Sequence, residues 1–342
     1  MGCNRQIAVD VMGGDGGPSV TVPAALQVLL HHPDLLLYLV GDETDIQPLL
    51  TTCNRQDVLD RIKIVHTRCT VNAHDKPSKV LRDKTKSSMY MAVELVQQSQ
   101  AQACVSAGNT GALLMSGRHL LKTIPGVDKP AIIAIIPGAT TNCYLLDVGA
   151  NVDCKAEQLF QFAVMGSVLA ESLDGLSRAR IGLLNIGAEE YKGNEQVQLA
   201  ASLLETSEAI NYIGFIEGSA LYDGNADVVV CDGFVGNVTI KSSAGVVNVI
   251  NNYLDDGIAT DWYTRMCAQL LSPLMSRLRR KINPSQFNGA SLLGLQGSIV
   301  KSHGNANTEG FAFAIEQAVR EAENNVPGLI ANEVAKIIRL AE

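Results

Sequence analysis

The chain has 342 residues, of which 46% are apolar and 18% are charged, a composition typical of a folded globular protein. Its formal net charge of −8 argues against a general nucleic-acid-binding protein, which needs a basic face. The longest apolar runs, at 35–41 and 131–138, are too short to span a bilayer. No apolar signal region precedes the first predicted strand, so we expect a cytoplasmic protein. The length fits one large α/β domain over residues 1–342.

Predicted strands alternate with predicted helices along most of the chain. Short apolar, β-branched runs predict strands at 5–13, 35–41, 61–66, 103–108, 131–138, 142–150, 180–187, 212–218 and 227–233. Apolar residues at helical spacing predict helices at 18–31, 86–99, 110–122, 155–173, 193–207 and 234–255. This alternation is typical of a three-layer α/β/α sandwich, in which a mostly parallel sheet lies between helices.

The eight cysteines are spaced singly, and no two of them form a C-x-x-C motif. Most lie in apolar stretches, where a reduced cysteine behaves as a small hydrophobic residue. We therefore expect neither a disulfide framework nor a zinc site, and the sequence predicts no metal and no organic cofactor.

Glycine, asparagine or aspartate follows nearly every predicted strand. Examples are the segments DVMGGDGGP, SAGNTG, DVGANVD, NIGAEEYKGNE and CDGFVGN. In an open α/β sheet the ligand lies beyond the carboxyl ends of the strands, and glycine there lets it approach the backbone closely. Helices that begin directly after such turns offer free N–H donors and a partial positive charge. We therefore expect the carboxyl edge of the sheet to form one anion-accepting surface.

Motifs of several common enzyme classes are absent from the sequence. It contains no G-x-x-x-x-G-K-[ST] loop, no G-x-G-x-x-G fingerprint, no H-E-x-x-H and no G-x-S-x-G nucleophile elbow. A reaction in which phosphate itself attacks would need no protein nucleophile. Binding, orientation and stabilisation of an oxyanion would then supply most of the catalysis.

Six motifs in order resemble the PlsX family, the phosphate acyltransferases of bacterial phospholipid synthesis. They are IAVDVMGGDGGP, SSMYMAVELV, ACVSAGNTGALL, LLDVGANVDC, LLNIGAEEYKGNEQV and VVVCDGFVGNVTIK, and together they span essentially the whole chain. The resemblance implies a homodimer with a fold similar to phosphotransacetylases and to isocitrate and isopropylmalate dehydrogenases. It implies that acyl-[acyl carrier protein] and inorganic phosphate become acyl phosphate and free carrier protein, which feeds the acylation of glycerol 3-phosphate. Lys86 departs from the family pattern, in which an acidic residue is expected.

Catalytic candidates follow from the charges in this reaction. Two anions meet, so a cation should lie nearby, and Lys192 in GAEEYKGNE is the first choice; the alternative is an exposed surface lysine. Asn109 and Asn237 could donate to phosphate or to the oxyanion, or could cap the helices that follow them. His303 could position phosphate or donate a proton, although a lone histidine is more often structural.

Phosphate-binding candidates are the small and polar residues that follow the strands. They are Asp10, Gly13, Gly14, Asp15, Gly108, Thr110, Gly111, Asn151, Gly187, Asn194, Asp232, Gly233 and Gly236. Because carboxylates repel phosphate, we expect the three aspartates to orient backbone donors or a lysine, or to form turn hydrogen bonds. Asn151 and Asp153 either support the site or cap the next helix.

An amphipathic helical element is predicted at about 240–283. The carboxyl end of this element carries the most basic cluster of the chain, which consists of Arg277, Arg279, Arg280 and Lys281. Such an element could lie on an anionic membrane, receive an acidic carrier protein, or pack on its own domain or in a dimer interface. Together with the family resemblance, this element favours an enzyme that associates peripherally with the membrane. Its expected partners are acyl carrier protein and the downstream glycerol-3-phosphate acyltransferase.

Two other functions remain open from the sequence. A phosphotransacetylase that uses a coenzyme A thioester shares the expected fold and chemistry, and donor preference would separate it from the first reading. A non-catalytic membrane-docking scaffold would bind anionic vesicles without turnover, but it would not need so many glycine-rich strand ends.

Overall fold

The computed structural model describes residues 5–83, 85–138, 140–259, 266 and 287–341. Its strands are β1 (Arg5–Asp10), β2 (Leu35–Gly41), β3 (Ile62–His66), β4 (Ala103–Ser106), β5 (Ala131–Ile136), β6 (Cys143–Leu146), β7 (Arg180–Asn185), β8 (Asn211–Glu217), β9 (Val228–Val230), β10 (Ala290–Leu293) and β11 (Ser298–Lys301). Its helices are α1 (Pro18–His31), α2 (Glu43–Leu50), α3 (Gln56–Leu59), α4 (Pro77–Asp83), α5 (Ser88–Gln97), α6 (Thr110–Leu120), α7 (Ala156–Asp174), α8 (Glu195–Glu205), the 3₁₀ helix η1 (Gly218–Tyr222), α9 (Gly233–Ala259), α11 (Thr308–Asn324) and α12 (Val326–Ala341).

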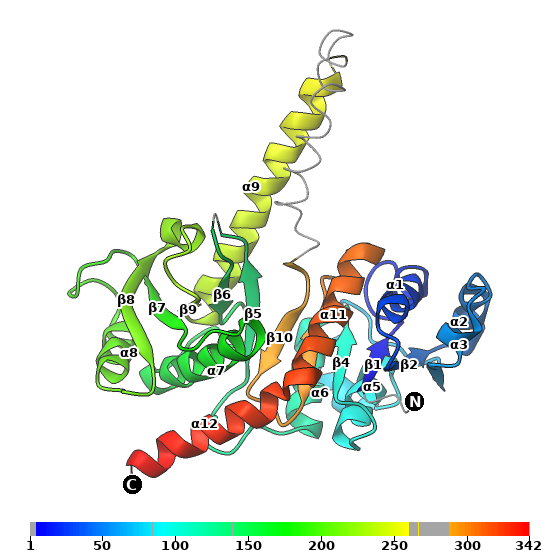
Figure 1. Cartoon of the computed structure of the whole chain (residues 1–342), viewed down its shortest axis with the longest axis horizontal. Helices are drawn as coiled ribbons and strands as arrows, with labels where there is room; N and C mark the ends of the chain where they lie inside the picture. Colours follow the sequence, from blue (N-terminus) through cyan, green and yellow to red (C-terminus); the bar gives the residue numbers. More distant parts are fainter. Residues whose placement is uncertain (1–4, 84, 139, 260–265, 267–286, 342) are drawn as a thin grey trace.

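One sheet runs through the whole molecule. Its 11 strands lie in the order β3-β2-β1-β4-β11-β10-β5-β6-β9-β7-β8. The pairings β11–β10, β10–β5 and β5–β6 are antiparallel, and the others are parallel. In Figure 1 the blue and cyan half and the green half lie side by side, with β5 and β10 between them. The prediction of an α/β fold with a mostly parallel sheet is confirmed.

The direction of the strands corrects the expectation of one anion-accepting edge. Three antiparallel pairings in a row separate β11 from β6, so the parallel strands of the second half run opposite to those of the first. The carboxyl ends of β1, β4 and β11 therefore lie at one edge, and those of β6, β7 and β9 at the other. The expectation was wrong because it treated all strands as parallel and did not include β10 and β11.

Helices cover both faces of the sheet, and side chains that alternate along the strands build a core on each side. In the first half, Ile7 and Val9 of β1 pack toward α1 and α11, while Ala8 packs toward α5 and α6. In the second half, Leu146 of β6 packs toward α7, and its neighbour Leu145 joins a smaller cluster on the opposite face. This two-sided burial explains why the strands are apolar throughout.

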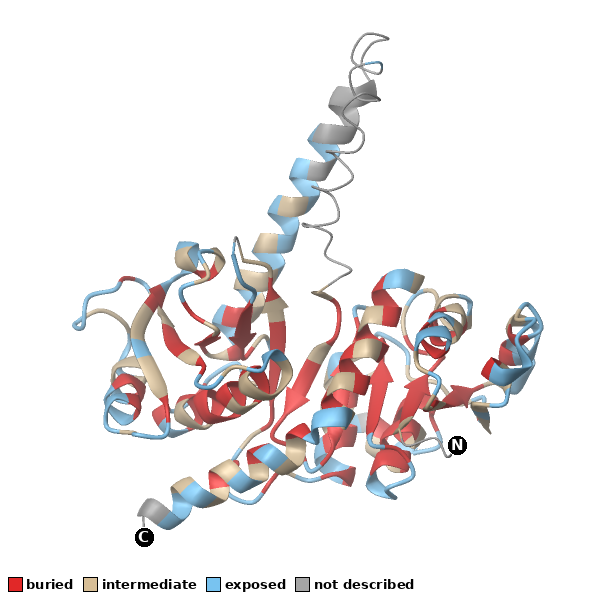
Figure 2. Ribbon diagram, viewed as in Figure 1, coloured by how far each residue is buried: buried red, intermediate tan, exposed pale blue. Residues whose placement is uncertain are grey.

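The helix α9 stands away from the body of the molecule. Figure 1 shows it projecting beyond the sheet, and Figure 2 shows the part nearer the body coloured mostly as exposed or intermediate. Val246, Val249, Ile250 and Tyr253 are all exposed on it. None of the helices in the described ranges is long and apolar enough to cross a membrane. The predicted element at 240–283 is thus helical as far as Ala259, and Arg277, Arg279, Arg280 and Lys281 lie outside the described residues.

A buried carboxyl group joins α11 to the central strands. Glu321 is 1% exposed and accepts hydrogen bonds from Ser291 on β10 and from Gln317. Burial raises the pKa of Glu321 to about 7, although hydrogen bonds from Ser291, Gln317 and Ser298 oppose part of the rise. The neighbouring Arg320 pairs with Asp174 instead. The fold therefore favours the neutral acid more than the unfolded chain does.

Replacing this carboxyl group tests its effect on stability. A folded-state pKa above the unfolded value means that the stabilisation is fully present below about pH 4.5 and is lost as the pH rises through about 7. Relative to Glu321→Gln, the wild type should therefore lose roughly 3 kcal/mol of unfolding free energy between pH 5 and pH 8.5. Urea denaturation of both proteins at several pH values measures this difference, and a pH-independent difference would contradict it.

Candidate functional site

The carboxyl ends of β1, β4 and β11 form the first group of strand-end loops. These strands are adjacent, and their registers place Asp10 beside Ser106 and Ser106 beside Lys301. The chain passes from β1 to β2, which pairs with one side of β1, whereas β4 pairs with the other side of β1. This is the topological switch point at which open α/β sheets bind ligands.

Asp10 is the buried centre of this first group. It is 1% exposed, and its Oδ2 accepts a hydrogen bond from the Ser106 hydroxyl at 2.6 Å. Its Oδ1 is buried without a hydrogen-bond partner in the described part of the chain. Burial raises the pKa of Asp10, while Ser106 and the nearby Ser88 oppose part of the rise. An orphaned carboxylate oxygen is costly, so this position favours a cation or a hydrogen-bond donor.

Lys301 is the cation beside Asp10, and the sequence analysis missed it. Its Nζ lies 3.4 Å from the carbonyl oxygen of Ala107 and donates to the carbonyl of Ser302. Burial lowers the pKa of Lys301 to about 8, and the charge of Asp10 opposes this shift. The only sequence signal was the KSHGN segment, because a strand of four residues that ends in lysine does not stand out as apolar.

His303 lies at the rim of the same group. Its backbone N–H donates to Asn288 Oδ1 at 2.9 Å, and its side chain is exposed. Partial loss of hydration and the charge of Lys301 lower the pKa of His303. The imidazole is therefore mostly neutral at pH 7. The structure brings this predicted residue close to Lys301.

The glycines of the first group are required by close backbone contacts. A Cβ on Gly13 would lie 2.8 Å from both Asp10 Oδ2 and the backbone nitrogen of Gly108. Gly14 has φ +86°, and a Cβ there would lie 2.9 Å from the carbonyl oxygen of Gly304. Asp15, whose side chain is exposed, donates its N–H to that same oxygen at 2.7 Å. The β1 and β11 loops are thus held together, as a shared site needs.

Asn109 caps α6 rather than presenting a free amide. Its Oδ1 accepts from the N–H of Ala112 at 3.0 Å, and its Nδ2 donates to the carbonyl oxygens of Ala73 and Asp75. The capping alternative therefore describes its side chain. The N–H groups of Thr110 and Gly111 have no acceptor among the described residues. They are the free donors that the α6 N-terminus offers to an anion.

The second group lies at the other edge, where β6 and β9 end. Asp147, which was not a predicted site residue, accepts from the N–H groups of Ile132, Gly149, Ala150 and Asn151. Burial raises its pKa, and these hydrogen bonds oppose part of the rise. Asp147 therefore organises the loop rather than the chemistry.

The predicted residues of the second group mostly serve that loop and the start of α9. Asn151 donates to Asp147 and to the carbonyl of Pro130, and Asp232 caps α9 through the N–H of Val235. Gly233 donates its N–H to the carbonyl of Asn151, and Gly236 packs against the backbone of Asp147. Asn237 lies beside Gly149.

The third group follows β7 and contains Lys192. Its Nζ forms an ion pair with Glu189 Oε2 at 2.7 Å and lowers the pKa of Glu189. Lys192 folds over Gly187, and its carbonyl oxygen accepts from Asn185. Asn194 caps α8 by accepting from the N–H of Val197. Among the described residues no hydrogen bond or ion pair joins this group, or the second, to the first.

Comparisons with known proteins agree with this fold. A family model described as "Fatty acid synthesis protein" matches residues 5–329. A phosphate acyltransferase of Shewanella sp. (strain W3-18-1) is 50% identical over 333 residues, covering 97% of each chain. A phosphate acyltransferase of Shewanella baltica (strain OS155) is 49% identical over 336 residues, covering 98% of each chain.

Solved structures with low sequence identity share the fold. The EutD phosphotransacetylase from Staphylococcus aureus has a TM-score of 0.60 and 18% identity, and covers 94% of this chain and 95% of its own. A phosphotransacetylase from Streptococcus pyogenes has a TM-score of 0.61 and 16% identity, with the same coverage. Together, the family match over residues 5–329 and the relatives near 50% identity show that the chain belongs to the PlsX family of phosphate acyltransferases.

Proposed function

We propose that this protein transfers the acyl group of an acyl-[acyl carrier protein] to inorganic phosphate, and that phosphate binds at the carboxyl ends of β1, β4 and β11. A phosphate oxygen attacks the thioester carbonyl, the new C–O bond forms, and the C–S bond breaks. The thiolate leaves and takes up a proton to give the free carrier thiol. The acyl phosphate then feeds the acylation of glycerol 3-phosphate.

The observation that supports this site most is the half-buried Lys301 near Asp10, which has one orphaned oxygen. The ammonium group offsets the charge of phosphate, and the free N–H groups at the start of α6 add donors. Asp10 Oδ1 can accept from Lys301 or from the O–H of hydrogen phosphate. Because Asp10 is a carboxylate, its role is to hold the cation and to favour a protonated phosphate oxygen.

No strong general acid is needed in this proposal, because thiolate is a good leaving group. The mostly neutral His303 at the rim positions phosphate rather than protonating the thiolate. Catalysis comes from alignment of phosphate with the carbonyl and from stabilisation of the oxyanion. Lys192 and Asn237 remain predicted contributors from the other edge.

The reaction itself is tested with purified protein and palmitoyl-carrier protein, with and without phosphate. Free thiol should appear only when phosphate is present, together with an equal amount of acyl phosphate. Release from acyl-coenzyme A but not from the carrier protein would support a phosphotransacetylase instead. No turnover with either donor would leave the scaffold function.

Lys301→Met tests the phosphate site. Loss of this cation should raise the KM for phosphate and lower kcat/KM about 100-fold, the scale expected for removing one preorganised electrostatic group. In the wild type, kcat/KM for phosphate should fall as the pH rises through about 8, because Lys301 then loses its charge. Lys301→Arg should move this decline to higher pH.

Two control variants accompany this test. Lys122→Met removes an exposed lysine elsewhere and should leave the kinetics unchanged. Lys192→Ala should raise the KM for phosphate less than Lys301→Met, because Lys192 already pairs with Glu189. A folded Lys301→Met protein with the wild-type KM for phosphate and the wild-type pH profile would exclude the site.

Membrane association is proposed to use the exposed apolar face of α9. Val249→Ser/Tyr253→Ser should weaken co-sedimentation with anionic vesicles several-fold, because the two side chains contribute apolar area. Turnover of soluble acyl-carrier protein should not change. If the variant instead shifts the sedimentation coefficient from dimer to monomer and vesicle binding is unaffected, the face is an interface between two copies.

A further inference from the structure

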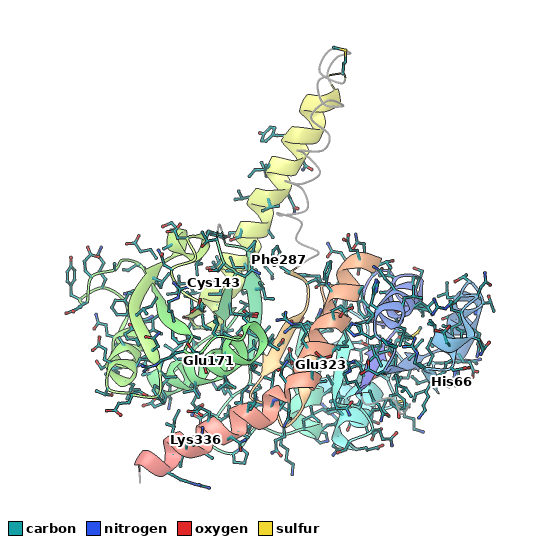
Figure 3. The ribbon with its side chains drawn as sticks, in the orientation of Figure 1. His66, Cys143, Glu171, Phe287, Glu323 and Lys336 are labelled. Atoms are coloured by element: carbon teal, nitrogen blue, oxygen red, sulfur yellow. The ribbon has the colours of Figure 1, made fainter. Side chains whose placement is uncertain are left out.

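Positive charge is concentrated in residues 61–86, here called the basic surface. This segment contains eight lysines and arginines against two aspartates, a net charge of +6, in a chain whose net charge is −8. It runs from the edge strand β3 through α4 to the start of α5. In Figure 3 His66 marks this end of the molecule. Residues 61–86 are therefore a positively charged segment of an acidic chain, at one end of the first half of the molecule.

Several of these cations are exposed and unpaired. Lys76, Arg82 and Lys86 are exposed, and none of them forms an ion pair within the described ranges. Two others have structural partners, since Arg61 donates to backbone carbonyls and Arg68 pairs with Asp42. The first three charges are thus available to a partner, and they are the part of the basic surface that the fold does not use.

The basic surface borders the proposed phosphate site. The Asn109 amide, which caps α6, donates to the carbonyl oxygen of Ala73 at 2.8 Å and to that of Asp75 at 3.3 Å. A Cβ on Gly111 would lie 2.7 Å from Pro77, the first residue of α4. The loop that carries Lys76 therefore rests directly on the α6 N-terminus, whose free N–H groups face the anion.

The other end of the basic surface reaches the same site. The carbonyl oxygen of Lys86 accepts from the Thr67 hydroxyl at 2.6 Å, and Ser88, two residues further on, lies near Asp10. Between β3 and the start of α5 lies an open hollow of about 480 Å³, whose lining mixes the charged Lys86 and Glu94 with Tyr90 and Met91. A partner seated here would be within reach of the reacting atoms by a flexible arm.

A protein partner fits this surface better than a bilayer does. No large apolar side chain is exposed among the described residues of 61–86, whereas α9 exposes several. Membrane-surface segments combine basic residues with inserted apolar ones. Charge without apolar anchors is instead typical of surfaces that steer the encounter with an acidic protein.

We propose that the basic surface, through Lys76, Arg82 and Lys86, is the docking site for the acidic carrier protein that delivers the acyl thioester. This inference rests on the proposed acyl-carrier donor. It places the carrier beside the α6 N-terminus, so that the thioester on its flexible arm enters the site between β1 and β4. The carrier is held mainly by charge, and the acyl transfer itself does not involve these three side chains.

Charge reversal tests the docking site. Lys76→Glu/Arg82→Glu/Lys86→Glu should raise the KM for palmitoyl-carrier protein and lower kcat/KM about tenfold or more, with kcat nearly unchanged, because like charges then face the carrier. In the wild type, kcat/KM should fall as ionic strength rises, and this dependence should be weaker in the variant. Turnover of palmitoyl-pantetheine, a small uncharged thioester donor, should be the same in both proteins.

A matched control reverses three exposed cations far from this surface, in Lys122→Glu/Lys336→Glu/Arg339→Glu. Figure 3 shows Lys336 on α12, well away from His66. This control changes net charge equally and should keep the wild-type KM for the carrier protein.

The remaining outcomes are separable. If the wild type fails to use the carrier protein, the proposed function is at fault. If the wild type uses it and the docking variant keeps both its KM and its salt dependence, the docking site is overturned. If the docking variant instead loses binding to anionic vesicles while its KM for the carrier is unchanged, the surface binds lipid and the proposal also fails.

Discussion

The pairing of β11 with β4 is the contact on which both the sheet and the candidate site depend. It brings Lys301 beside Ser106 and one strand away from Asp10, although about two hundred residues of chain separate the β4 and β11 segments. The next strand, β10, runs antiparallel to β11 and pairs with β5, so the same segment also joins the two halves. Removing this segment would leave the first half with an open edge and Asp10 without a nearby cation.

Placing the charged groups of Asp10 and Lys301 inside the fold costs electrostatic free energy. Burial opposes the charged form of both Asp10 and Lys301, and the attraction between them recovers only part of the penalty. One oxygen of Asp10 stays without a partner among the described residues, although two serines, Ser106 and Ser88, lie near it. Unpaired buried groups of this kind concentrate at sites that bind ligands. The loops around them are fixed by backbone contacts, so a ligand meets donors that are already positioned.

The sequence predicts local features of this molecule well and long-range ones poorly. Apolar, β-branched runs identify β1 to β9, and Asn109 caps its helix as one of its two predicted alternatives has it. Asn194 and Asp232 also cap helices, a role that the sequence analysis does not assign to either of them. These features depend on neighbouring residues, which a sequence pattern contains. The direction of the second half depends on β10 and β11, which are short and follow the segment 260–283 that resembles no strand.

The candidate site shows the same limit. Asp10 and His303 are predicted, and both lie near Lys301, which the sequence pattern does not single out. The expected cation, Lys192, instead pairs with Glu189 at the other edge. Proximity to glycine was a poor guide to which lysine faces an anion, because glycine-rich turns follow strands at both edges. The two lysines differ in their carboxylate neighbours, because Lys301 lies near the buried Asp10 whereas Lys192 pairs with the exposed Glu189. The place of Lys301 follows from the order of the strands in the sheet, which no local pattern contains.

The proposed reaction converts a water-soluble donor into an amphiphilic product, an acyl chain that carries a phosphate group. The surfaces of the molecule show a similar division between charge and apolar area. The basic surface at residues 61–86 lacks exposed apolar anchors, whereas α9 exposes apolar side chains and carries one basic residue, Lys241, in its first three turns. A carrier protein and a lipid surface would therefore not compete for one patch. Because β3 is an edge strand of the sheet and α9 projects away from the body of the molecule, a donor at the basic surface and a membrane at α9 would contact separate parts of the enzyme. A change of charge at the basic surface would then alter activity through the encounter with the carrier protein. A change of apolar area on α9 would instead alter how much of the enzyme lies at the membrane.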